Sequence, residues 1–273
     1  MDGKLNWEQA VVQFRNEPAN REIAEACYYD DPLLNAAERF VTSTEWASLV
    51  SILPSKLGQV LELGAGRGVA SYAFARSGWT VTALEPDPSD IVGAGAIRCL
   101  AEQSNTKISV VEEWGERLPF NDAVFDVVYC RAVLHHAQDL SALVKEIGRV
   151  LKPGGVFLGT REHVVDSHSD ILVFQDQHPL HRLYGGEFAY LIDEYIGAIT
   201  AAGLKIDKIL NPMESDINLF PLTRKLMKES IARKIGLPML WRIIPNFLLT
   251  WRGERISSPG RLYSFICHRP HHD

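Results

Sequence analysis

The 273-residue chain has few cysteines, no excess of positive charge and no long apolar run. Its four cysteines are far apart and include no C-x-x-C pair, so neither a zinc site nor a disulfide framework is expected. The net charge of -6 argues against a general nucleic-acid-binding protein, because such proteins need a basic face to neutralise phosphates. Since no apolar leader or run of 18 apolar residues is visible, the sequence predicts a cytoplasmic protein without a nucleic-acid partner.

A dinucleotide fingerprint is also lacking, although a glycine-rich turn is present. Gly64, Gly66 and Gly68 follow the short apolar run 59–63. Such glycines let the backbone turn sharply beside a ligand, at the start of a helix expected over 69–77. A dinucleotide site would need glycine at position 69, which is Val69 here. Glu62 favours a cationic ligand group, such as the amino group of S-adenosylmethionine, over a phosphate.

Apolar runs and helical patterns alternate along the rest of the chain. This alternation predicts an α/β, doubly wound and mostly parallel seven-stranded sheet with helices on both faces. Residues 1–50 are expected to form a helical cap before the sheet, and further helices are expected at 141–150 and 187–202. The seven strands are expected at 59–63, 80–85, 107–111, 125–130, 156–160, 204–210 and 262–267.

Between the last two predicted strands lies a basic and aromatic stretch, residues 219–256, which is too long for a hairpin. It is expected to form an inserted helical subdomain. The stretch contains eight Arg and Lys residues against two Glu residues, together with two tryptophans. One interpretation is an ordinary amphipathic cap that packs on the core; the other is contact with a membrane surface.

Six motifs, in order, resemble those of the class I S-adenosylmethionine-dependent methyltransferases. They are Glu62-Leu-Gly-Ala-Gly-Arg-Gly68, Leu84-Glu85-Pro86, Glu116-Arg-Leu-Pro-Phe120, Phe125-Asp-Val-Val128, Leu134-His-His136 and Leu151-Lys-Pro-Gly-Gly155. The resemblance covers about residues 55–160. It implies an enzyme with a Rossmann-like methyltransferase domain, formed by 51–218 and 257–273, and S-adenosyl-L-methionine as its cofactor.

The resemblance assigns cofactor contacts to residues of suitable chemistry. Glu85, at the end of the second strand, would bind both ribose hydroxyls, because a carboxylate has two accepting oxygens. Glu62 would lie near the methionine amino group, directly or through water. The remaining cofactor residues of these two motifs are Gly64, Ala65, Gly66, Gly68 and Pro86.

Adenine recognition departs from the usual family pattern. Many relatives have an aspartate where this chain has Trp114. Trp114 could pack on the adenine, Glu113 or Glu116 could accept from its amino group, and the Gly115 N–H could donate to a ring nitrogen. The residues expected around the methionine tail are Cys130, Arg131 and His135, with helix packing as the alternative for the histidine.

The polar segment 161–187 is the expected acceptor site. Methyl transfer is an SN2 displacement, to which an enzyme contributes alignment, exclusion of water and removal of the acceptor proton. The pKa of histidine suits such a base, and the candidate bases are His163, His178 and His181. No H-x-x-x-H pair with a third ligand stands out, so no metal is predicted.

Residues 177–187 and the helix expected after them are similar to methyltransferases of bacterial surface glycans and secondary metabolites. This similarity implies O-methylation of a sugar or another hydroxylated small molecule, and a lipid-linked glycan would also explain the 219–256 stretch. N- or C-methylation of a lipid, quinone or amine is the first alternative. A non-catalytic cofactor-binding scaffold is the second. A homodimer is the default oligomeric expectation.

Overall fold

A computed structural model describes residues 4–271, which are built around one sheet. Its strand order is β3-β2-β1-β4-β5-β8-β7, with β6 paired to β5. Strand β8 runs antiparallel to β5 and β7, and the other pairs are parallel. The strands are β1 (Gln59–Leu63), β2 (Thr80–Leu84), β3 (Ile108–Val111), β4 (Phe125–Arg131), β5 (Leu151–Val165), β6 (Tyr190–Leu191), β7 (Lys205–Leu210) and β8 (Arg261–His268).

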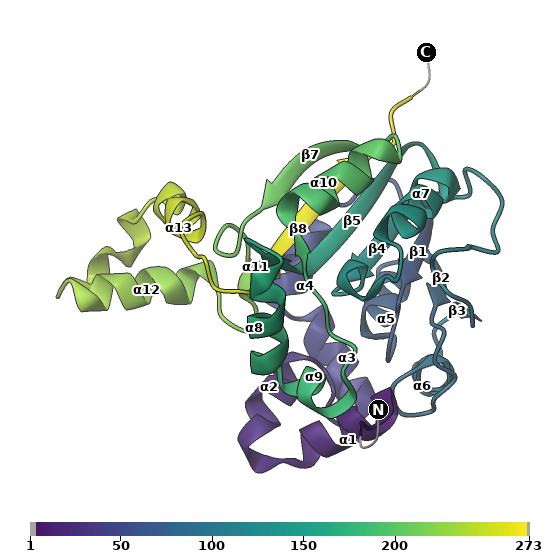
Figure 1. Cartoon of the computed structure of the whole chain (residues 1–273), viewed down its shortest axis with the longest axis horizontal. Coiled ribbons are helices and arrows are strands. Elements are labelled where there is room, and N and C mark those ends of the chain that lie inside the picture. Colours follow the sequence, from purple (N-terminus) through teal and green to yellow (C-terminus); the bar gives the residue numbers. More distant parts are fainter. Residues whose placement is uncertain (1–3, 272–273) are drawn as a thin grey trace.

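Two apolar cores lie on opposite faces of the sheet, because successive strand residues point to opposite sides. Leu61 and Val128 belong to one core, and their neighbours Val60 and Val127 belong to the other. The first core is covered by α7 (Leu140–Val150) and α10 (Ile192–Ala201). The second is covered by α3 (Leu33–Val41), α4 (Thr44–Val50) and α5 (Val69–Arg76). The α6 helix (Ala94–Ser104) follows β2 on the same side as α5 (Figure 1).

The doubly wound, mostly parallel α/β fold is confirmed, and all seven predicted strands are present. The helix predicted at 187–202 is wrong in its first turn, since α10 begins at Ile192. Tyr190 and Leu191 instead form the additional strand β6 beside Val164 and Val165. This eighth strand is too short for an alternating pattern to reveal it.

An N-terminal helical layer covers the carboxyl ends of the central strands (Figure 1). Its first helices are α1 (Trp7–Asn16), η1 (Pro18–Asn20) and α2 (Arg21–Ala26). The chain just before α1 is tied to α9 (Pro179–Tyr184), which follows α8 (Ser169–Gln177). The Leu5 N–H donates to the Leu183 carbonyl at 3.0 Å, and the Lys4 ammonium donates to the His181 carbonyl at 3.0 Å. Segments that lie 177 to 178 residues apart in the sequence are therefore held together over the carboxyl ends of the strands.

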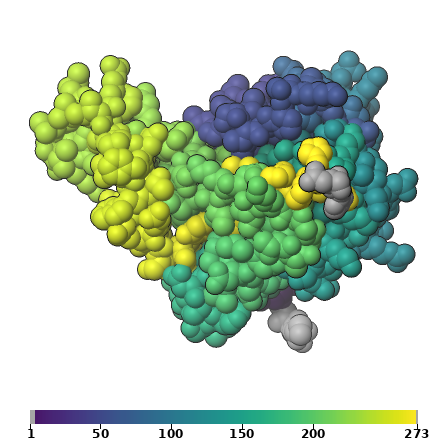
Figure 2. All heavy atoms as spheres, turned by 90° about the horizontal axis from the view of Figure 1, so that it is seen from above, coloured from purple at the N-terminus to yellow at the C-terminus, as the bar shows by residue number. Residues whose placement is uncertain are grey.

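A helical lobe projects from the body between β7 and β8 (Figure 1). After α11 (Asp216–Leu219) it contains α12 (Arg224–Lys234), η3 (Pro238–Ile243) and α13 (Asn246–Gly253). The space-filling view shows this lobe standing away from the remaining chain (Figure 2). None of the helices within residues 4–271 has the length and apolar character needed to cross a membrane.

Candidate active site

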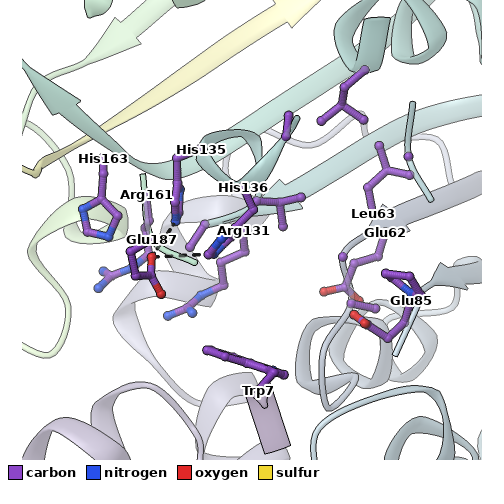
Figure 3. A pocket seen from close by; sticks show the side chains of 18 of the residues that line it. Trp7, Glu62, Leu63, Glu85, Arg131, His135, His136, Arg161, His163 and Glu187 are labelled. Carbon is purple, nitrogen blue, oxygen red and sulfur yellow. Dashed lines mark ion pairs between the residues drawn. The ribbon is translucent and has the colours of Figure 1, made fainter. Parts of the chain in front are cut away.

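A pocket of about 450 Å³ lies at the carboxyl ends of β1, β2, β4 and β5 (Figure 3). Strand β1 lies between β2 and β4, where the strand order reverses, and open α/β sheets bind ligands at such points. The predicted site residues that line this pocket are Glu62, Gly64, Ala65, Glu85, Pro86, Trp114, Gly115, Glu116, Arg131, His135, His163 and His178.

Four other predicted site residues do not line this pocket: Gly66, Gly68, Cys130 and His181. Gly66 and Gly68 form the turn behind the pocket wall, both with positive φ. Cys130 packs in the first apolar core, whereas its neighbour on β4, Tyr129, points to the opposite face of the sheet. His181 faces the backbone, with its Nδ1 3.1 Å from the Glu187 carbonyl oxygen.

The glycine turn fixes the position of Glu85. Gly64 has a φ of +60°, and a Cβ there would lie 2.7 Å from a methyl group of Val133. Two residues on, the Gly66 N–H donates to Glu85 Oε2 at 2.7 Å, and the Asp87 N–H donates to Oε1 at 3.0 Å. Burial raises the pKa of Glu85. The turn thus aims a nearly buried carboxylate at the pocket.

Glu62 is a second buried carboxylate at the same turn, only 4% exposed. It accepts a hydrogen bond from the Ser71 hydroxyl in α5. Burial raises the pKa of Glu62 to about 7, against the lowering effect of the Ser71 bond. Because no basic side chain forms an ion pair with it among the described residues, an added cationic ligand group would favour its ionised form.

The loop after β3 forms the third wall of this half of the pocket. Trp114 is 61% exposed and lines the pocket with Gly115 and Glu116. Glu116 already accepts from the Gln138 N–H at 3.0 Å, and Glu113 accepts from the N–H of Trp114 at 2.9 Å. An exposed indole at a pocket rim offers a flat apolar surface for an aromatic ligand.

At the other half of the pocket, Arg131 is held by an acid from the N-terminal layer. Glu45 in α4 is 1% exposed and accepts from Arg131 Nε at 2.8 Å and from Nη2 at 3.0 Å. A bidentate pair of this kind fixes the plane of the guanidinium. The sequence gives no sign of this partner, since 86 residues separate the two side chains.

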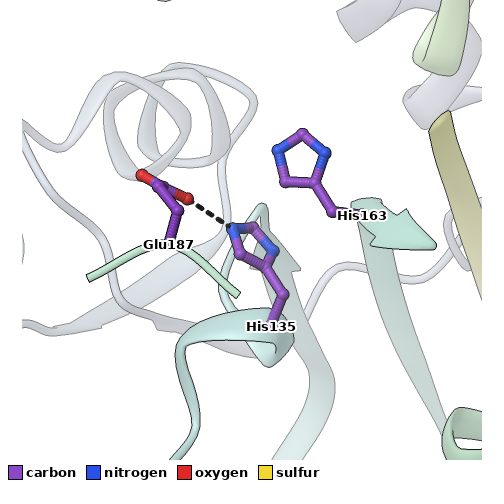
Figure 4. A group of neighbouring side chains, drawn as sticks. All are labelled: His135, His163 and Glu187. Atoms are coloured by element: carbon purple, nitrogen blue, oxygen red, sulfur yellow. Dashed lines mark ion pairs between the residues drawn. The ribbon is translucent and has the colours of Figure 1, made fainter. Parts of the chain in front are cut away.

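His135 lies at the centre of a buried cluster of histidines and glutamates (Figure 4). Its Nδ1 lies 2.8 Å from Glu162 Oε2, and its Nε2 lies 3.5 Å from Glu187 Oε2. Burial by itself would lower the pKa of His135, but the bonds to Glu162 and Glu187 raise it to about 9. For Glu187 the directions are reversed: burial by itself would raise its pKa, but the bond to His135 and the nearby His136 lower the pKa overall.

Two of the predicted bases, His163 and His178, border this cluster. His163 Nδ1 is 2.7 Å from the Gly260 carbonyl oxygen, which fixes the proton on Nδ1 and leaves Nε2 free. His178 Nδ1 is buried without a hydrogen-bond partner among the described residues and lies 3.9 Å from Glu187 Oε1. Burial lowers the pKa of both histidines, so both are neutral near pH 7.

The sequence marks Glu162 and Glu187 only as part of a polar segment, and it misses Glu45 and Trp7 as site residues. Trp7 lines the pocket from α1 and packs edge-on against Tyr184 at 4.8 Å. Their roles depend on contacts between distant segments, which spacing along the chain does not encode. His135 could be predicted from the sequence, because its motif follows the end of a predicted strand.

Comparison with known proteins begins with a family model described as a methyltransferase domain, which matches residues 61–159. The ubiquinone biosynthesis O-methyltransferase of Methylobacterium nodulans is 36% identical over 109 residues, covering 38% of this chain and 41% of the relative. The enzyme of that name from Rhizobium leguminosarum is 27% identical over 170 residues, covering 59% and 66%. The chain thus matches about two fifths of the length of the first of these relatives.

Solved structures cover more of the chain at lower identity. A geranyl diphosphate C-methyltransferase from Streptomyces coelicolor has a TM-score of 0.59 and 12% identity, covering 98% of this chain and 89% of that one. The [4+2]-cyclase SpnF has a TM-score of 0.58 and 18% identity, covering 87% and 82%. These likenesses show the fold alone. Since one of the two is a cyclase, the activity must be argued from the site.

Proposed function

We propose that this chain, whose residues 61–159 form a class I S-adenosylmethionine-dependent methyltransferase domain as the sequence predicts, methylates a hydroxyl group of a small molecule. One observation carries this proposal: the pocket that contains Glu62 and Glu85 beside the glycine turn also contains His163 and His178 at its other end, and burial lowers the pKa of both histidines. The relatives named O-methyltransferases support oxygen as the methylated atom.

The cofactor fits the first half of the pocket. Glu62 would bind the methionine amino group and Glu85 the ribose hydroxyls, with the adenine beside Trp114. Each assignment matches an available group: a buried carboxylate without a basic partner, a carboxylate aimed by two backbone N–H groups, and an exposed indole. The cofactor, when bound, supplies the sulfonium methyl group.

His178 is the proposed general base. The nearby Glu187 oxygen favours the tautomer with a proton on Nδ1, which leaves Nε2 to accept the hydroxyl proton. As that proton leaves, the acceptor oxygen attacks the methyl carbon, the new O–C bond forms and the S–C bond breaks. The bonding electron pair remains on sulfur, so the sulfonium loses its charge and S-adenosylhomocysteine departs.

The projecting lobe supports the proposed acceptor class. Residues 219–256 carry a net charge of +6 in a chain with a net charge of -6. Ten large apolar side chains of this segment are exposed, and Met239 is 86% exposed. Exposed apolar side chains among basic ones are typical of contact with an anionic membrane surface. An amphiphilic acceptor presented there would be a lipid-linked glycan or, since the relatives are named for ubiquinone biosynthesis, a hydroxylated precursor of a quinone.

Calorimetry with S-adenosylhomocysteine tests the cofactor half of the proposal. We expect micromolar binding to the wild-type protein and none to Glu85→Ala. Absence of binding to folded wild-type protein would contradict the proposed activity and favour the scaffold alternative.

Turnover of phenolic and glycoside acceptors by wild type and His178→Gln tests the base. Loss of a general base costs about 10²–10⁴-fold in rate, so kcat should fall by this factor while S-adenosylhomocysteine affinity is retained. A matched His168→Gln variant serves as control, because His168 is exposed and lies outside the pocket. Unchanged kcat in His178→Gln, with transfer to an amine or carbon acceptor, would favour the N- or C-methylation alternative.

Sedimentation with liposomes tests the lobe. We expect wild-type protein to bind vesicles that contain an anionic phospholipid, to bind neutral vesicles less, and to dissociate in high salt. The double variant Met239→Ser/Ile243→Ser should lose binding without losing the pocket, because both side chains lie on the lobe, where they are 86% and 72% exposed. If the protein instead forms a concentration-dependent dimer that buries these side chains, the lobe binds a second copy of the chain and the membrane part of the proposal is wrong.

A further inference from the structure

The acceptor end of the pocket brings together nitrogen and oxygen ligands from three separate segments. His135 follows β4, His163 lies in β5 and Glu187 precedes β6. One ligand atom from each side chain lies within 4.8 Å of the others. Figure 4 shows these three side chains facing one another. The expectation of no metal rests on the lack of an H-x-x-x-H pair on one helix. These three ligands instead lie on separate segments within a span of 53 residues.

The Nδ1 atom of each imidazole has a hydrogen-bond partner of the kind that orients metal-binding histidines. The His135 Nδ1 lies 2.8 Å from the Glu162 carboxylate, and the His163 Nδ1 lies 2.7 Å from the Gly260 carbonyl. A metal-bound histidine usually donates its other N–H to a carboxylate or a backbone carbonyl, which orients the ring. In both rings the nitrogen left for an ion is Nε2, and that of His135 faces Glu187.

The charges of the cluster also suit a cation. Glu162 and Glu187 are 0% and 4% exposed. Among the described residues, their ion-pairing partners within 4 Å are histidines alone. Arg131, which lines the same pocket, is already paired with Glu45. His135 is the partner that these two buried carboxylates share, and a divalent ion that takes the place of its Nε2 proton would supply the positive charge instead.

We propose that His135, His163 and Glu187 bind a divalent first-row transition-metal ion of the zinc type at the acceptor end of the pocket. Two imidazoles disfavour magnesium and calcium, which prefer oxygen ligands. Three protein ligands leave a coordination position open, as in catalytic zinc sites. That position is where the hydroxyl oxygen of the acceptor would bind, a role that rests on the proposed methyltransferase function.

The ion would be linked to the cofactor turn through the loop that follows β4. Glu162 accepts the N–H groups of both Val133 and His135, each at 3.1 Å. Val133 lies against the glycine turn, because a Cβ at Gly64 would be only 2.7 Å from a methyl carbon of Val133. One short loop thus carries a metal ligand on one side and a wall of the cofactor site on the other.

Titration of the chelator-treated protein with Co²⁺ and Zn²⁺ tests the site directly. We expect one Co²⁺ per chain with visible d–d absorption, displaced by Zn²⁺, and one Zn²⁺ per chain by calorimetry. Glu187→Gln and His163→Gln should each weaken binding by more than about 100-fold, because loss of an outer-shell partner alone costs about 10–100-fold. His168→Gln, an exposed histidine outside the cluster, should bind like wild type.

The same protein samples are titrated with S-adenosylhomocysteine, which separates this proposal from the proposed function. Metal binding without S-adenosylhomocysteine binding would uphold the site and refute the function. Absence of Co²⁺ absorption and of Zn²⁺ heat at millimolar metal would overturn the site, whatever the cofactor result. Equal affinity in wild type, Glu187→Gln and His163→Gln would also overturn it. Retained S-adenosylhomocysteine binding verifies that the variants are folded.

Discussion

Glu62 is expected to make both stability and cofactor binding depend on pH near neutrality. Burial raises the pKa of its carboxyl to about 7 in the folded protein, from an ordinary value of 4.5. The folded state therefore holds a proton that the unfolded state has already lost between these pH values. Stability from this group is fully present below pH 4.5 and is lost as pH rises through 7.

The size of the effect follows from the pKa difference. Each unit corresponds to 1.36 kcal/mol, so the free energy of unfolding of the ligand-free protein should fall by about 3 kcal/mol between pH 4.5 and 7 through this group. Binding has the opposite dependence, because a cationic amino group needs the ionised carboxylate. About a tenth of Glu62 is ionised at pH 6 and nine tenths at pH 8, so S-adenosylhomocysteine affinity should rise about tenfold over this interval.

Calorimetric titration with S-adenosylhomocysteine at pH 6, 7 and 8 measures the effect, with Glu62→Gln as the matched control. Glutamine keeps the hydrogen bond to Ser71 possible but does not ionise, so the variant should bind weakly with little dependence on pH. Urea unfolding at pH values from 4.5 to 7 should show a steeper fall of stability in wild type than in Glu62→Gln. The reasoning is refuted if wild-type affinity is constant from pH 6 to 8, or if Glu62→Gln shows the same tenfold change.

Three further substitutions test the structural arguments. Glu45→Gln should lower the free energy of unfolding by about 3 kcal/mol in urea titration, because it leaves the Arg131 charge, which is only 15% exposed, without its partner; an effect below about 1 kcal/mol would contradict a strong pair. Gly64→Ala should cost about 1–2 kcal/mol for its positive φ, plus the contact with Val133, and should abolish S-adenosylhomocysteine binding by calorimetry. Gly197→Ala, in the α10 helix with free space around its Cβ, should instead raise stability by about 0.5–1 kcal/mol and leave binding intact.

The sequence by itself determined the sheet and the cofactor half of the site, because both depend on local patterns. Short continuous apolar runs set the strands, and Glu62, the glycine turn and the acid that ends the second strand all lie within 24 residues. The carboxyl ends of adjacent parallel strands must meet at one edge, so this topology alone placed Glu62 and Glu85 at the same pocket.

Only the tertiary structure decided the acceptor half. Glu187 was expected at the start of a helix, yet it precedes β6 and reaches His135 from 52 positions along the chain. Glu45 and Trp7 enter the site from the N-terminal layer, whose docking depends on side-chain packing between distant helices. Local periodicity determines which face of an element is apolar, but not which distant polar group will meet another in the space that packing leaves.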